Sequence, residues 1–261
     1  MPVAAETSAC RDSKIFFVIP IQQVGYTTLT TQRDVKEAQV NPTTLIIPGL
    51  NGSGPDHWQS VWERERDDCR RVVQAHWNDP KPDAWCAQLE DAVAGVTGPV
   101  VLVAHSLGCA TVVHWAAHTT LRSTRIAALL VAPCDVERPD APPSVQRFAP
   151  LPAIALPFAS VVVASRDDVY ATPARSRCLA DGWGSTFVDA GALGHINAAS
   201  ALGTWEFGQV LLDELRARVR HDGVRHRRAA ALRTASFAPF GSPCADVTAR
   251  PVPEVRESAR P

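Results

Sequence analysis

The sequence contains no apolar run that is long enough to cross a membrane. The uncharged stretch at residues 148–165 is interrupted by three prolines, whereas a spanning helix needs about 20 predominantly apolar residues. Near the N-terminus, Glu6 and Asp12 precede a short apolar stretch that Pro20 interrupts, which is not the pattern of a secretory signal peptide. We therefore expect a cytoplasmic protein that does not associate with membranes.

Cysteine is scarce and scattered. The seven cysteines are odd in number, and no two lie at the spacing of a metal site or a redox motif, which favours reduced thiols in the cytoplasm. Cys109 and Cys134 are expected to be small core residues. His114 and His118 share a helix face but have no third ligand nearby, so no metal site is predicted.

Lysine is rarer still, with three residues against 23 arginines. Residues 216–261 hold ten arginines and four acidic residues, a net charge of +6, which leaves −7 for the rest of a chain whose formal charge is −1. An acidic body is a poor nucleic-acid binder, because phosphate contacts need clustered basic side chains. We therefore predict no nucleic-acid partner, and the sequence leaves the oligomeric state open.

From residue 43 onward, short apolar runs alternate with amphipathic stretches, and no internal repeat is visible. This alternation is typical of parallel strands joined by helices. The expected strands are Thr43–Ile47, Arg71–Ala75, Pro99–Ala104, Ile126–Ala132, Ser160–Ala164 and Thr186–Val188. The expected helices are Asp56–Asp68, Asp83–Val96, Leu107–Ala117, Thr172–Asp181 and Thr204–Val219. The pattern predicts an α/β fold with a mostly parallel central sheet and helices on both faces, a three-layer sandwich.

One domain over residues 43–220 accounts for this pattern. Residues 1–42 are a poorly specified extension, in which Lys14–Thr31 fits either a loose segment or a hairpin. Residues 221–261 are rich in Arg, Ala and Pro and are expected to form a disordered tail. The proline-rich segment Pro139–Pro157 is expected to be an insertion that can cover a site.

The most informative motif is AHSLG at residues 104–108, which lies between a predicted strand and a predicted helix. A serine on such a turn exposes its hydroxyl at the carboxyl edge of the sheet, beside the amide groups of the helix N-terminus. Gly108 permits tight packing, and Ala104 replaces the glycine usual at that position. A serine nucleophile needs a base and an orienting carboxylate, which in this fold follow in the order Ser, Asp, His. Asp168 and His195 follow later strands in that order, although Asp167 is adjacent to Asp168.

The segment PGLNGSGPDHW, residues 48–58, follows the first strand of the predicted domain. Its glycines allow the amide of Leu50 or Asn51 to turn toward an oxyanion together with the amide of Leu107. The spacing fits neither Gly-Lys-Ser/Thr nor GxGxxG, which argues against a phosphate-binding loop. His57 and Trp58 are expected at the same edge, with packing of the first helix as the alternative role of Trp58, so Asn51, His57 and Trp58 are candidate pocket residues.

Residues 43–218 resemble the small serine hydrolases of the α/β-hydrolase superfamily that are grouped as the retinoblastoma-binding protein nine and YdeN family. The resemblance rests on IIPGLNGSGPDHW at 46–58, HWNDPKPDAW at 76–85, AHSLG at 104–108, ASRDDVY at 164–170 and GHIN at 194–197. It implies an α/β-hydrolase fold with Ser106 as nucleophile, His195 as base and Asp168 as acid, and no cofactor or metal. Val169 stands where the family has proline, so Asp167 stays an alternative to Asp168.

The expected activity is hydrolysis of a small ester or activated amide through an acyl-enzyme intermediate, with the backbone amides of Leu50 and Leu107 as the oxyanion hole. The expected partner is therefore a small-molecule substrate. The alternative is a protein-interaction module that keeps the fold with little or no turnover.

Overall fold

The computed structural model describes residues 41–121 and 125–235, with side chains up to residue 220. Six parallel strands form one sheet in the order β2-β1-β3-β4-β5-β6. They are β1 (Thr43–Ile47), β2 (Cys69–Arg71), β3 (Val100–His105), β4 (Ile126–Val131), β5 (Ala159–Ala164) and β6 (Thr186–Asp189). The helices are α1 (Trp58–Glu65), α2 (Pro82–Ala94), α3 (Leu107–His118), α4 (Pro143–Gln146), α5 (Pro173–Gly182) and α6 (Glu206–Ala235), with a 3₁₀ turn at Ala198–Ser200.

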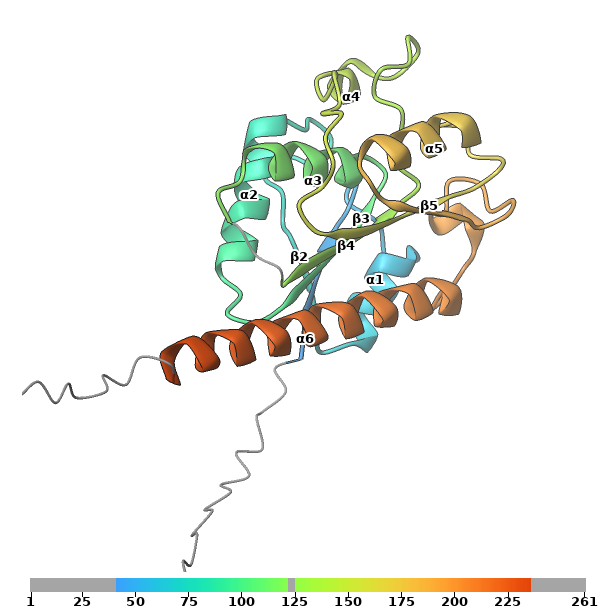
Figure 1. Ribbon diagram of the computed structural model, residues 1–261. Helices are drawn as coiled ribbons and strands as arrows, with labels where there is room; N and C mark the ends of the chain where they lie inside the picture. The colour runs from blue at the N-terminus through green and yellow to red at the C-terminus, as the bar shows by residue number, and fades with distance from the viewer. Residues whose placement is uncertain (1–40, 122–124, 236–261) are drawn as a thin grey trace, which may run out of the picture. The chain divides into compact units, whose positions relative to one another are not determined.

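The two faces of the sheet bury separate cores, as alternation along a strand requires. Alternate residues of β3 show this: Leu102 packs with α2, α3 and α5, whereas Val101 and Val103 pack with α1 and α6. Figure 1 shows the same three layers, with α2, α3 and α5 above the sheet and α1 and α6 below it. The predicted three-layer α/β sandwich is thereby confirmed.

The central strands β3 and β4 are buried along their whole length, which explains their continuous apolar sequence. Two of the helices begin with signals that are visible in the sequence. Thr172 accepts a hydrogen bond from the Arg175 amide ahead of α5, and Pro82 and Pro173 occupy the first turns of α2 and α5, where a missing N–H costs nothing.

Two predicted elements differ from the structure. The second strand is β2 at Cys69–Arg71 rather than Arg71–Ala75. The last helix, α6, continues through residue 235, so the predicted disordered tail is wrong for residues 221–235, whose Ala- and Arg-rich sequence has high helix propensity. Nearly all of the N-terminal extension, with its open choice between loose segment and hairpin, lies outside the described residues, as do residues 236–261. None of the described helices is both long and apolar enough to span a membrane.

Candidate active site

Ser106 lies on a sharp turn between β3 and α3. Its backbone has φ 54° and ψ −120°, a conformation that costs a non-glycine residue free energy and persists only where its surroundings enforce it. The turn packs against the end of β1: a Cβ atom on Gly108 would lie 2.3 Å from the Ile47 carbonyl oxygen, and one on Gly49 would lie 3.0 Å from the Ser106 Cβ. Only glycine fits at position 108, as expected from the motif, and the packing holds the Ser106 hydroxyl at the pocket.

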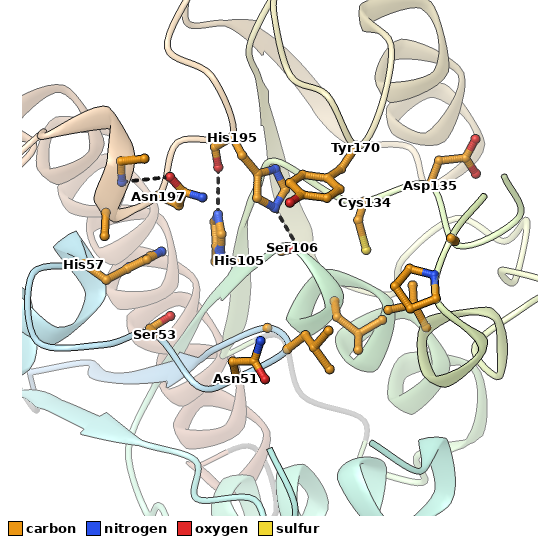
Figure 2. A pocket seen from close by; sticks show the side chains of 18 of the residues that line it. Asn51, Ser53, His57, His105, Ser106, Cys134, Asp135, Tyr170, His195 and Asn197 are labelled. Atoms are coloured by element: carbon orange, nitrogen blue, oxygen red, sulfur yellow. Dashed lines mark hydrogen bonds between the residues drawn. The ribbon is translucent and has the colours of Figure 1, made fainter. Parts of the chain in front are cut away.

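The structure brings Ser106, His195 and Asp168 together. The His195 Nε2 atom lies 2.9 Å from Ser106 Oγ, a contact drawn in Figure 2. The His195 Nδ1 atom lies 2.8 Å and 3.0 Å from the two Asp168 carboxylate oxygens. The His195 and Asp168 side chains are only 9% and 3% exposed. An imidazole held in this way between a hydroxyl and a carboxylate can accept the hydroxyl proton.

The two adjacent aspartates have different partners. Asp167 accepts hydrogen bonds from the Ser165 hydroxyl at 2.7 Å and the Gly194 amide at 2.8 Å, and these bonds lower the pKa of Asp167 below its ordinary value. Asp168 faces His195 and also accepts the Tyr170 amide at 2.8 Å. Asp167 therefore braces the backbone beside His195, while Asp168 contacts the imidazole itself.

The amides expected to face an oxyanion lie beside Ser106. Leu107 is the first residue of α3, where the amide has no partner within the helix and lies at the positive end of the helix dipole. In the loop after β1, the Asn51 amide already donates to the Trp77 carbonyl at 2.9 Å. Because the Asn51 amide is already engaged, Leu50 is the better candidate from this loop. Leu50 and Leu107 both line the pocket.

A pocket of about 420 Å³ surrounds Ser106. In Figure 2, His57, Ser53 and Asn197 lie on one side of Ser106, and Cys134 and Asp135 lie on the other. The insertion lines the pocket with the apolar side chains of Ala141, Pro142 and Val145 and with the charged Asp140, and the adjacent Arg138 lines it too. The pocket thus combines a small apolar wall with charged and polar side chains around the serine.

Of the three candidate pocket residues, Asn51 and His57 line the pocket and Trp58 does not. Trp58 is 1% exposed and packs against Trp62 and Trp205, each at a ring-centroid distance of 4.7 Å. Trp58 is therefore not a pocket residue but packs the first helix, the alternative expected from the sequence, because α1 begins there and consecutive helical residues point about 100° apart.

Three imidazoles form a row beside the pocket. The ring centroids of His57 and His105 are 4.6 Å apart, and those of His105 and His195 are 4.8 Å apart. Burial lowers the pKa of His57 to about 4, helped by the nearby His195 and Arg71, and burial lowers the pKa of His105 well below its ordinary value. The first two rings are therefore neutral at physiological pH. Sequence reasoning missed His105, although its place directly before Ser106 at the end of a strand was a usable signal.

Cys109, Cys134 and His114, which were considered earlier, have structural roles. Burial raises the pKa of the Cys134 thiol to about 12 and that of Cys109 well above its usual range, so both stay protonated, although Cys134 lines the pocket. The His114 Nε2 atom donates to the Phe148 carbonyl at 2.7 Å. Within the described part of the chain, no three His, Cys, Asp or Glu residues form a group that could hold a metal ion.

Comparison with known proteins identifies the family of the chain. A family model described as serine hydrolase matches residues 44–214. The crystal structure of a protein from Pectobacterium atrosepticum, described as a YdeN-like hydrolase, is 30% identical with a TM-score of 0.61, over 69% of this chain and 92% of that one. A search of curated proteins found no match.

Two more distant structures share the fold. The ydeN product of B. subtilis is 19% identical with a TM-score of 0.57, over 68% of this chain and 100% of that one. A thermophilic esterase from Thermogutta terrifontis is 16% identical with a TM-score of 0.51, over 68% of this chain and 90% of that one.

Proposed function

The chain belongs to the serine hydrolase family, and from this premise we propose that it hydrolyses a small ester or activated amide through a triad of Ser106, His195 and Asp168. The observation that carries the proposal is the unbroken series of hydrogen bonds from the Ser106 hydroxyl through His195 to Asp168. A protein that only bound a partner through this fold would have no need of that series at the base of a pocket.

The proposed reaction begins when Ser106 Oγ attacks the substrate carbonyl carbon and His195 Nε2 takes the hydroxyl proton. Asp168 holds the Nδ1–H and stabilises the imidazolium that forms. The amides of Leu50 and Leu107 donate to the oxyanion of the tetrahedral intermediate. The intermediate expels the leaving group, which receives the proton from His195, and water then hydrolyses the acyl-enzyme by the same route.

The apolar wall suggests how the substrate lies. We place the acyl chain against Ala141, Pro142 and Val145, and the leaving group on the side of Asn197. The pocket volume of about 420 Å³ suits a small acyl group, since binding pockets for small molecules span about 300–1,000 Å³.

A panel of p-nitrophenyl esters tests the proposal with three proteins: wild type, Ser106→Ala and Ser53→Ala. Ser53 is a matched control because it is a second pocket serine, and its hydroxyl donates to the Gln59 side chain at 2.7 Å. Turnover should fall by about 10³-fold or more in Ser106→Ala and persist in Ser53→Ala. Retained turnover in Ser106→Ala would show that the nucleophile is another group. Absence of turnover by wild type on every ester and amide tried would favour the interaction module.

A further inference from the structure

The residue that follows His195 has a strained backbone. Ile196 has φ 47°, which is a genuine outlier for a β-branched side chain, and its side chain is fully buried. A residue in this region is destabilising and keeps its conformation only when neighbouring groups hold it there. The loop that carries the base therefore needs specific contacts on this side.

Two buried ring N–H groups supply these contacts to consecutive carbonyls. The His105 Nε2–H donates to the His195 carbonyl at 2.9 Å, and the Trp58 Nε1–H donates to the Ile196 carbonyl at 2.8 Å. His105 and Trp58 are only 5% and 1% exposed, so neither hydrogen bond competes with bulk water. Figure 2 shows the His105 ring beneath the His195 backbone, with this bond drawn.

We propose that Trp58 and His105 are positioning residues that hold the His195 imidazole against Ser106, an inference that rests on the proposed function. The two peptide units that they fix follow the His195 Cα atom and so constrain the direction of its side chain. His105 is the last residue of β3 and directly precedes Ser106. Its hydrogen bond therefore ties the strand that leads to the nucleophile to the loop that carries His195. Without these donors, Ile196 can relax from its strained conformation and move the imidazole away from the serine.

The part of the loop before His195 is held by different groups, so Trp58 and His105 do not duplicate their role. The Leu193 amide donates to the Ser165 hydroxyl at 2.8 Å, and the Gly194 amide donates to Asp167 at 2.8 Å. These bonds fix the chain before His195. Directly after His195, the Ile196 amide donates to the Leu193 carbonyl and the Asn197 amide to the Ser200 hydroxyl, each at 3.1 Å and each within the loop. Trp58 and His105 join this part of the loop to α1 and β3.

The first test compares Trp58→Phe with Trp62→Phe. Trp62 lies four residues further along α1, is fully buried, and donates its own Nε1–H to the Thr204 carbonyl at 2.7 Å, near the far end of the β6–α6 connection and away from the His195 peptide units. Each substitution keeps an aromatic ring and removes one buried indole donor, and the Thr204 carbonyl still accepts a hydrogen bond from the Gln209 side chain at 2.9 Å. We expect the melting temperature to fall in both variants, whereas kcat falls about 10- to 100-fold only in Trp58→Phe, with KM within about twofold of wild type. Equal kcat values for the two variants would overturn the inference.

The second test uses His105, and it decides the matter if Trp58→Phe does not fold. His105→Gln keeps a side-chain N–H that can donate to the His195 carbonyl, and His105→Leu removes it. We expect His105→Gln to retain most of the kcat that His105→Leu loses, with KM unchanged in both. Equal loss in the two variants would count against a positioning role.

Labelling of wild type with a fluorophosphonate separates this inference from the proposed function. If wild type is not labelled at Ser106, the proposed function itself fails. If Ser106 is labelled but Trp58→Phe reacts as fast as Trp62→Phe, only the positioning role fails.

Discussion

His57 makes the fold sensitive to acid. Burial beside His195 and Arg71 lowers its pKa from 6.5 to about 4, and the His105 ring also faces it. Between these two pH values, the unfolded chain binds a proton at His57 that the folded protein does not, so stability falls as the pH drops. The difference in pKa corresponds to about 2 kcal/mol of unfolding free energy lost at pH 5 and about 3 kcal/mol below pH 4.

The substitution His57→Asn isolates this effect. His57 is also the N-cap of α1, where its Nδ1 accepts the Gln59 amide at 3.1 Å, and asparagine is a favourable N-cap without a titrating group. Its unfolding free energy should therefore depend less steeply on pH from 6.5 to 4, with a slope flatter by up to about 1.4 kcal/mol per pH unit.

Urea unfolding monitored by tryptophan fluorescence between pH 4.5 and 7 gives these free energies. His57→Ala separates the cap from the titration, because loss of the cap should lower stability by about 1 kcal/mol at every pH while the same flattening remains. Parallel curves for wild type and His57→Asn would refute the reasoning.

Three further predictions follow from contacts at the pocket. Asp168→Asn should lower kcat by about 10³-fold or more and Asp167→Asn by less than about tenfold, and steady-state ester kinetics would contradict the assignment if the order were reversed. Gly108→Ala places a Cβ atom 2.3 Å from the Ile47 carbonyl oxygen, so thermal unfolding should show a loss of at least about 3 kcal/mol; a variant as stable as wild type would refute the packing. Val145→Ala should shift the preferred p-nitrophenyl ester to a longer acyl chain, and an unchanged preference would place the acyl group elsewhere.

The order and limits of the central elements could be predicted from sequence because local pattern and burial agree there. β3 is buried on both faces and reads as a continuous apolar run, and the turn at Ser106 follows it directly. The position predicted for the edge strand β2 was wrong because this strand pairs with one neighbour only, β1, and that pairing sets its span. The apolar residues Val72 and Val73 lie beyond the strand, and Val73 is 64% exposed.

The site was only partly predictable for a similar reason. The motif order suggested Ser106, Asp168 and His195, and the structure brings them together. The bond from His105 to the His195 carbonyl joins residues 90 positions apart, and the bond from Trp58 to the Ile196 carbonyl joins residues 138 apart. Such contacts depend on how the helices pack on the sheet, which periodicity does not encode.

The measurement that tests the account most directly is mass spectrometry of the protein after treatment with a fluorophosphonate. We predict one covalent adduct per chain on the peptide that contains Ser106, with labelling abolished in Ser106→Ala and retained in Ser53→Ala. No adduct on wild type, or an adduct of equal yield on Ser106→Ala, would contradict the assignment of Ser106 as the nucleophile.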